Sequence, residues 1–122
     1  MKVYLCGPIN GCTDEAATNW REWVKARLPD TLDPMRRDYR GLEDLHVHEI
    51  VDGDKADIDR CDAVLVNYDR PSVGTAMEVL YAYERKRFVV VVARSDAAIS
   101  PWMRRHAHVI VDSFADALTH LR

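Results

Sequence analysis

One stretch of the chain decides the fold: Ala63-Val-Leu-Val-Asn-Tyr-Asp-Arg-Pro-Ser-Val-Gly-Thr-Ala-Met-Glu78. The apolar run 63–66 predicts a buried strand, segment 67–74 a loop, and the pattern from Thr75 onward a helix with Glu78 in its first turn. In parallel α/β sheets, ligands bind where such strands end. Glu78 is therefore either a reactive carboxylate or, with Thr75, part of a capping box that satisfies free N–H groups.

The rest of the chain repeats this strand and helix unit. Thr13 and Ser113 are expected to cap two of the helices. The valine-rich run 88–92 is typical of a central parallel strand buried on both faces. The order predicts an α/β fold of about five parallel strands with helices on both faces. The other expected strands are 2–6, 31–33 and 109–111, and the other helices are 13–28, 45–60, a short turn or helix at 100–102, and 113–121.

Composition restricts the classes of function. The 122 residues suit a single domain spanning 1–122, and a net charge of −3 provides no basic field for a nucleic acid polymer. No run approaches the roughly 20 apolar residues that span a bilayer, so we expect no membrane partner. The three cysteines form no CxxC pair, which favours a reduced, cytoplasmic protein.

Several polar residues have both a functional and a plain structural interpretation. Asp54 is either an acid in the site or a solvated charge in an acidic run, and the spacing of that run matches no metal-binding loop. The arginines of segment 36–40 either face solvent or bind a phosphate or carboxylate. The Tyr4 hydroxyl either reaches the site or belongs to the core. Trp20 and Trp23 are interpreted as core residues.

The loop after the first strand and a later tryptophan complete the candidates. Gly7 and Gly11 flank a segment whose backbone can approach a ligand closely, although the loop is neither GxGxxG nor a Walker P-loop. Trp102 follows Pro101 in a polar stretch, which is typical of a rim or interface residue.

Four pieces of the chain together resemble the nucleoside 2-deoxyribosyltransferase family and its nucleotide N-glycosidase relatives. Their order and spacing extend over nearly the whole chain. The pieces are Val3-Tyr-Leu-Cys-Gly-Pro-Ile9, Asp54-Lys-Ala-Asp-Ile-Asp-Arg-Cys-Asp62, Gly74-Thr-Ala-Met-Glu78 and Ser100-Pro-Trp102.

The resemblance implies a flavodoxin-like doubly wound sheet and a catalytic role for three residues. Glu78 would attack C1′ of a deoxyribonucleoside, Asp54 would protonate the leaving base, and Tyr4 would position the nucleophile. A neighbouring subunit would complete each pocket with the segment around Trp102, in a homodimer or larger homo-oligomer. The residues implied to line the sugar and its 5′ end are Gly7, Pro8, Ile9 and Asn10, with Gly74 beside the nucleophile.

One position departs from the family pattern. Many transferases carry an acidic residue six positions before the nucleophile, where this chain has Ser72. Either base recognition differs, or Asp69 takes over from a shifted loop. Arg37 and Asn10 also suggest a 5′-monophosphate substrate, for which a serine is a neutral donor where an aspartate would repel the phosphate.

We therefore expect an enzyme that cleaves the N-glycosidic bond of 2′-deoxyribonucleosides or their 5′-monophosphates and transfers the deoxyribosyl group to another nucleobase. It would need neither cofactor nor metal, and its partners would be small nucleosides, nucleotides and nucleobases. The alternatives are a nucleoside 5′-monophosphate N-glycosidase that releases free base, a NAD-cleaving enzyme, and a non-catalytic nucleotide-binding module.

Overall fold

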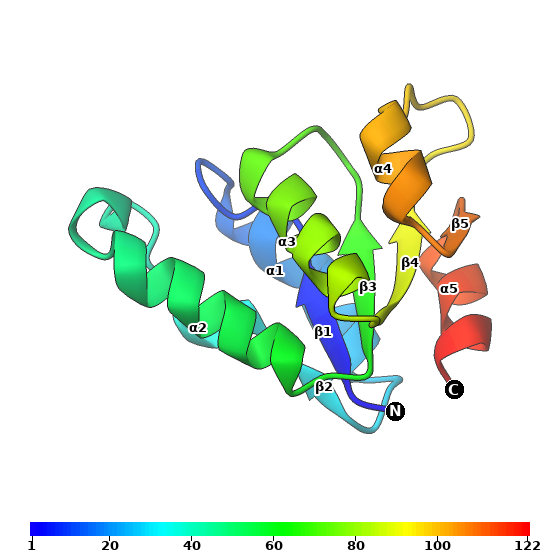
Figure 1. The fold of residues 1–122 in the computed structure, drawn as a ribbon, viewed down its shortest axis with the longest axis horizontal. Helices are drawn as coiled ribbons and strands as arrows, with labels where there is room; N and C mark the ends of the chain where they lie inside the picture. The colour runs from blue at the N-terminus through cyan, green and yellow to red at the C-terminus, as the bar shows by residue number, and fades with distance from the viewer.

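A parallel sheet of five strands in the order β2-β1-β3-β4-β5 forms the centre of the computed structural model, which describes residues 1–122 (Figure 1). This is the doubly wound, flavodoxin-like order, so the predicted fold class is confirmed. The chain changes direction across the sheet between β1 and β3, and ligands bind at such switch points. The strands are β1 (Val3–Cys6), β2 (Thr31–Leu32), β3 (Ala63–Asn67), β4 (Phe88–Val92) and β5 (Val109–Val111).

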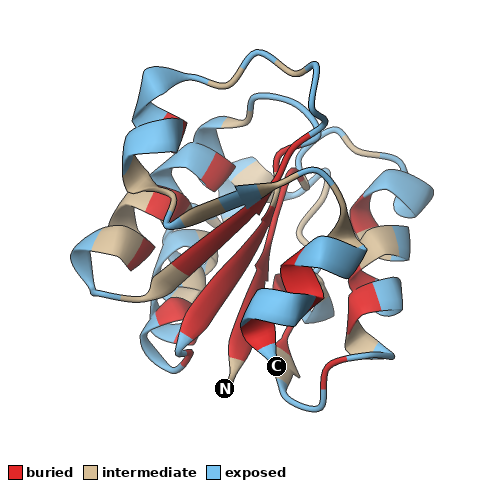
Figure 2. Ribbon diagram, turned by 90° about the vertical axis from the view of Figure 1, so that its right-hand side faces the viewer, coloured by how far each residue is buried: buried red, intermediate tan, exposed pale blue.

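Helices cover both faces of the sheet, and Figure 2 shows the buried strands enclosed between helices whose outer sides are exposed. On one face lie α2 (Val47–Asp59), α3 (Val73–Glu84) and α4 (Pro101–His106). On the other face lie α1 (Asp14–Lys25) and α5 (Phe114–Leu121). Two short 3-10 helices, η1 (Pro34–Arg36) and η2 (Glu43–Leu45), precede α2.

Alternation along the strands divides the core into two layers. Tyr4 and Cys6 of β1 face α2, α3 and α4, whereas Val3 and Leu5 face α1 and α5. All four side chains are fully buried, as expected for a strand with a neighbour on each side and helices on both faces. The register of β1 thus directs the Tyr4 side chain toward α3.

The start of α3 differs from the prediction. The helix begins at Val73, and Ser72 is its N-cap, with the Ser72 hydroxyl accepting from the Thr75 N–H at 3.4 Å. Thr75 therefore lies inside the helix, and Glu78 lies in the second turn, too far along to reach the free N–H groups. The capping-box interpretation of Glu78 and Thr75 is wrong, and the carboxylate is available for another role.

Two smaller expectations also need correction, and one is confirmed. The helix expected over 45–60 is divided, with η2 ending at Leu45 and α2 beginning at Val47. The valine-rich strand β4 lies between β3 and β5 and is buried on both faces, so its prediction as a central strand is confirmed. Trp23 is 36% exposed and packs against Phe114 and Arg27 at the surface rather than in the core.

The predicted caps of two other helices are confirmed. The Thr13 hydroxyl accepts from the Ala16 N–H at the start of α1, and the Ser113 hydroxyl accepts from the Asp116 N–H at the start of α5. No helix in the structure combines the length and apolar character required to cross a bilayer.

Candidate active site

The candidate site lies at the carboxyl end of β1, where Tyr4 meets Glu78. The Tyr4 hydroxyl donates a hydrogen bond to Oε2 of Glu78. Tyr4 is fully buried, while Glu78 is half-buried and faces a cavity. A rigid strand and a helix therefore fix the two ends of this contact, and the carboxylate retains access to a ligand.

The cavity beside Glu78 has a volume of about 110 Å³. It brings together predicted residues from both strand-end loops, from the arginine segment and from α2. Members of the predicted set that line it are Gly7, Ile9, Asn10, Arg37, Asp54, Ser72, Gly74 and Glu78. Segments that are distant in the sequence thus converge on one space at the switch point of the sheet.

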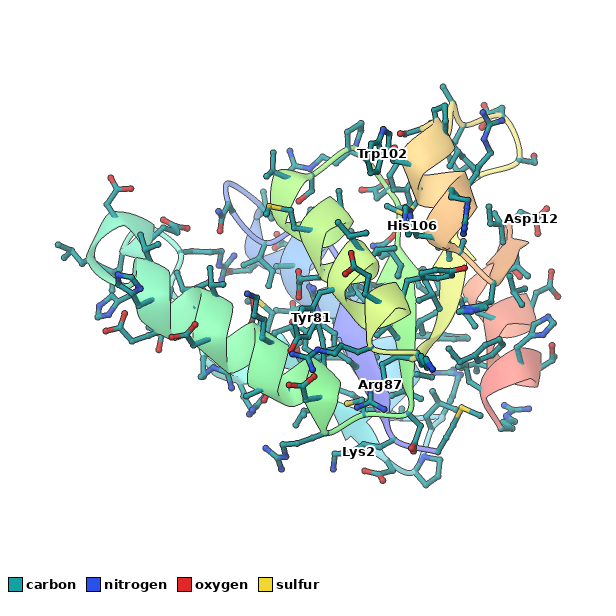
Figure 3. The ribbon with its side chains drawn as sticks, in the orientation of Figure 1. Lys2, Tyr81, Arg87, Trp102, His106 and Asp112 are labelled. Atoms are coloured by element: carbon teal, nitrogen blue, oxygen red, sulfur yellow. The ribbon has the colours of Figure 1, made fainter.

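Three predicted residues lie elsewhere. Pro8 and Asp69 line a separate depression beside Arg70, on the outer side of the loops after β1 and β3. Trp102 is 72% exposed on α4 and lines a cleft with Met77 of α3 (Figure 3). None of the three therefore lines the cavity that contains Glu78.

Burial shapes the acidity of Glu78. Loss of solvent, followed by repulsion from Asp54, raises the pKa of Glu78 to about 8. The hydrogen bond from Tyr4 and the positive charge of Arg21 act in the opposite direction. The site thus contains a carboxyl group that exchanges its proton near neutral pH, a property typical of groups in acid–base sites.

The neighbours of Glu78 are tuned in a consistent way. Burial first, and then the nearby Glu78 and Asp54 charges, raise the pKa of Tyr4 well above its usual value, so its phenol remains a donor. Burial also raises the pKa of Asp54, Arg37 opposes this effect, and Asp57 adds to it. Because the Glu78 and Asp54 carboxylates repel each other, ionisation of one raises the pKa of the other, and their titrations are coupled.

Asp54 belongs to an ion-pair cluster rather than to a solvated acidic face. Nη2 of Arg37 lies 3.4 Å from Oδ1 of Asp54 and 2.8 Å from Oδ2 of Asp57. Arg36 binds Asp57 through both guanidinium nitrogens, at 2.7 and 2.8 Å. Burial raises the pKa of Asp57, but the bonds from both arginines outweigh it and hold that pKa below its usual value.

A buried cation lies beneath the loop after β1. Arg21 of α1 is fully buried, and its Nη2 donates to the Gly7 carbonyl at 3.1 Å. Its Nε lies 3.6 Å from Asp33, the residue that caps η1. A Cβ atom at Gly7 would lie 2.9 Å from the Trp20 ring, so only glycine fits there. Arg21 therefore holds the loop that forms one wall of the cavity.

An apolar groove between α2 and α3 adjoins the cavity. Its volume is about 360 Å³, and Ile50, Asp54, Gly74 and Glu78 line both spaces. The groove extends along α3 past Tyr81, which Figure 3 shows on the side of α3 facing α2. The two carboxyl groups thus lie where a polar cavity meets an apolar groove.

The first turn of α3 also faces the cavity. The N–H groups of Val73 and Gly74 have no partner within the protein, as is usual at a helix start. Thr75 lines the cavity, and its buried side-chain hydroxyl has no hydrogen-bond partner. Such a group is costly unless a ligand or water satisfies it, and the helix dipole favours an anion here.

Sequence reasoning missed Arg21 and the role of Asp57. Arg21 occupies a position of α1 that the spacing of Ala17 and Val24 assigns to the buried face, and a charge at such a position is a detectable signal. Asp57 is indistinguishable from its acidic neighbours, because its burial depends on arginines some 20 residues upstream. No three histidine, cysteine, aspartate or glutamate side chains group as a metal site.

Comparison with protein families gives one match. The model of the family described as nucleoside 2-deoxyribosyltransferase matches residues 3–118. No curated protein matches the chain.

Solved structures share the fold. A 2-deoxyribosyltransferase from Bacillus psychrosaccharolyticus superposes with a TM-score of 0.77 at 17% identity, covering 96% of this chain and 90% of its own. The CMP N-glycosidase of Clostridium botulinum superposes with a TM-score of 0.66 at 14% identity, covering 99% of this chain and 98% of its own. At these identities the likeness is one of fold.

Proposed function

The chain belongs to the nucleoside 2-deoxyribosyltransferase family, and on that premise we propose that it cleaves the N-glycosidic bond of a 2′-deoxyribonucleoside or its 5′-monophosphate and transfers the deoxyribosyl group to another nucleobase. The observation that carries this proposal is the pairing of Glu78 with the buried Tyr4 hydroxyl in a cavity that Asp54 also lines. This arrangement supplies a nucleophile, a group that orients it and an acid.

The first half of the reaction forms a covalent intermediate. An ionised Glu78 oxygen attacks C1′ from the face opposite the base, and the C1′–N bond breaks with its electron pair passing to the base nitrogen. Asp54 donates its proton to the departing base, which leaves as the neutral nucleobase. The deoxyribosyl group remains as an ester on Glu78, as in retaining glycosidases.

The second half reverses these roles. A nitrogen of the incoming nucleobase attacks C1′, and the Glu78 oxygen leaves as a carboxylate. Asp54, now ionised, accepts the proton that the incoming nitrogen releases. Two inversions at C1′ give retention overall, and water in place of the second base gives hydrolysis.

The electrostatics of the site favour a single proton held between its two carboxyl groups. One carboxyl group must be ionised while the other carries a proton, and repulsion between Glu78 and Asp54 favours a pair that holds a single proton. The Tyr4 hydrogen bond and the Arg21 charge favour the ionised form of Glu78. They act against the burial that holds the pKa of Glu78 at about 8, so the cycle requires the shared proton to lie on Asp54 when Glu78 attacks.

The shape of the site supports one placement of the sugar and the base of the substrate. The cavity of about 110 Å³ is smaller than a typical ligand pocket of about 300–1,000 Å³, but it adjoins the groove of about 360 Å³. The sugar fits the polar cavity, and the base fits the apolar groove beside Ile50, Met77 and Tyr81. C1′ then lies at the junction, where Glu78 and Asp54 line both spaces.

Mass spectrometry tests the nucleophile and the reaction class together. The protein is mixed with a 2′-deoxyribonucleoside without acceptor, quenched in acid and digested. We expect a deoxyribosyl adduct on the peptide that contains Glu78, free base in solution, and neither with Glu78→Gln. Base release by the Glu78→Gln variant at the parent rate would refute the mechanism.

A second candidate function, hydrolysis of a nucleoside 5′-monophosphate, is favoured by the first turn of α3. The unpartnered Thr75 hydroxyl, the free N–H groups and the Ser72 hydroxyl offer donors to an anion, and Arg40 lines the same cavity. Incubation of nucleoside and monophosphate, each with and without a second base, separates the candidates. A product that forms only when the second base is present indicates transfer. Release of base from the monophosphate when no second base is present indicates the hydrolase.

Self-association forms part of the proposal. Val73, Met77 and Trp102 are large apolar residues, each more than 60% exposed, on α3 and α4. A second copy covering this surface would bring Trp102 to a neighbouring site and help to exclude water from it. Sedimentation velocity is expected to show a dimer or larger species. A Trp102→Glu variant is expected to be monomeric and impaired in turnover, and a monomeric, fully active parent would refute this part.

A further inference from the structure

Arg37 is anchored between two aspartates of α2. Its closer contact, at 2.8 Å, is with Oδ2 of Asp57, and the contact with Oδ1 of Asp54 is longer, at 3.4 Å. Asp57 is only 2% exposed and also binds Arg36 through both oxygens. The buried Asp57 carboxylate thus fixes Arg37, which presents its charge to Asp54.

Gly53 leaves space on α2 for the Arg37 guanidinium. A Cβ atom at Gly53 would lie 3.1 Å from Nη2 of Arg37 and 3.3 Å from its Cζ and Nε. The guanidinium therefore packs against the backbone of α2, one residue before Asp54. Glycine is a poor helix former, and its presence inside α2 is explained by the space that Arg37 occupies.

The charges around Asp54 come from four elements. Arg37 and Arg40 approach from the segment after η1, Asp57 from α2, Tyr4 from β1 and Glu78 from α3. Only Arg37 among them makes an ion pair with Asp54. An attached cation favours the ionised carboxylate, so the position of this guanidinium decides how readily Asp54 carries a proton.

We propose that Arg37 is a positioning residue: Asp57 and the space at Gly53 hold its guanidinium against Asp54, and this contact sets when Asp54 carries the proton that the leaving base needs. The inference rests on the proposed function for the role of Asp54 as the acid. It goes beyond that function by assigning Arg37 to Asp54 rather than to the substrate.

The test measures the Asp54 carboxyl titration by ¹³C NMR in a Glu78→Gln background, which removes the coupled carboxyl group. Arg37→Gln is expected to raise the Asp54 midpoint by about one pH unit or more, because an opposite charge in contact is lost. Arg36→Gln is the matched control, since it removes an equal charge from Asp57 but no contact with Asp54, and it is expected to shift the midpoint less. Arg37→Lys is expected to restore part of the effect.

Gly53→Ala separates positioning from folding. Alanine favours the helix, so the melting temperature is expected to match or exceed that of the parent. The added Cβ would lie 3.1 Å from Nη2, so the guanidinium must move by a few tenths of an ångström, and the Asp54 midpoint is expected to rise by less than in Arg37→Gln.

An unchanged Asp54 midpoint in Arg37→Gln, or an equal shift in Arg36→Gln, would overturn the proposal. An unchanged midpoint in Gly53→Ala would show that the space at Gly53 does not position Arg37. The titration needs no turnover. If the Asp54 midpoint does not respond to Arg37 in a protein that cleaves deoxynucleosides, only this inference is refuted. If the parent protein shows no turnover, only the proposed function is refuted.

Discussion

Replacing Glu78 by glutamine is predicted to stabilise the protein while abolishing turnover. The pKa of Glu78 is about 8 in the fold, against 4.5 for an ordinary glutamate. The unfolded chain holds this group ionised at neutral pH, so folding must either take up a proton or bury a charge. Glutamine avoids both costs, has nearly the same shape and can still accept the Tyr4 hydrogen bond.

The sign and size of the effect follow from proton linkage. A pKa that is raised on folding gives stability that is fully present below about pH 4.5 and is lost as pH rises toward 8. Each pH unit in this window costs the parent at most about 1.4 kcal/mol. Because Glu78 is half-buried and shares its proton with Asp54, we expect Glu78→Gln to raise the free energy of unfolding by about 1–3 kcal/mol at pH 7.

Urea denaturation from pH 4.5 to 8.5, followed by circular dichroism, measures this effect. The two proteins are expected to be nearly equal at the acidic end and to diverge as pH rises, with a plateau above pH 8. Glu84→Gln, an exposed carboxylate on the same helix, is the control and is expected to change stability by no more than about 0.5 kcal/mol. A difference that does not depend on pH, or a parent more stable than Glu78→Gln at pH 8, would refute the reasoning.

Three further substitutions test the remaining parts of the site. Tyr4→Phe removes one hydrogen bond to a charged group, worth about 1.5–3 kcal/mol, so kcat/KM is expected to fall roughly 10- to 100-fold. The control is Tyr83→Phe, which removes a hydroxyl that contacts only Arg105 and is expected to leave kcat/KM unchanged. Asp54→Asn is expected to lower kcat about 10²- to 10⁴-fold on an ordinary deoxynucleoside, but much less on one whose base is already cationic and leaves without a proton; equal losses on both would argue against an acid role. Thr75→Val is expected to raise KM for a deoxynucleoside 5′-monophosphate about tenfold, the effect of losing roughly one hydrogen bond, without changing KM for the nucleoside; a parallel change in both would place the hydroxyl away from the phosphate.

The features that could be predicted from the sequence are those set by local patterns. The apolar runs identify the strands because parallel strands covered on both faces need continuous apolar residues. Thr13 and Ser113 identify helix starts because each stands directly before a periodic segment. The strand order followed from the resemblance and is confirmed by the pairing of β1 with both β2 and β3.

The features that could not be predicted depend on contacts between distant segments. Ser72 and Thr75 are both good N-caps, and only the path of the loop after β3 selects Ser72. Asp57 resembles its solvated neighbours until Arg36 and Arg37 are placed beside it. In both cases local chemistry allows two outcomes, and the tertiary fold chooses between them.

The actual start of α3 changes what this helix can do for a ligand. A capping box would have used the Glu78 carboxylate to satisfy the helix itself, whereas the Ser72 cap leaves Glu78 one turn further along, with the N–H groups of Val73 and Gly74 free. Glu78 lies four positions after Gly74, which corresponds to about 6 Å along the helix axis. On the proposed function, one helix thus offers donors for the 5′ end of the substrate and, one turn later, the nucleophile for C1′. A pentose spans that interval, so under this proposal the register of α3 would orient the sugar with its anomeric carbon toward Glu78 and Asp54.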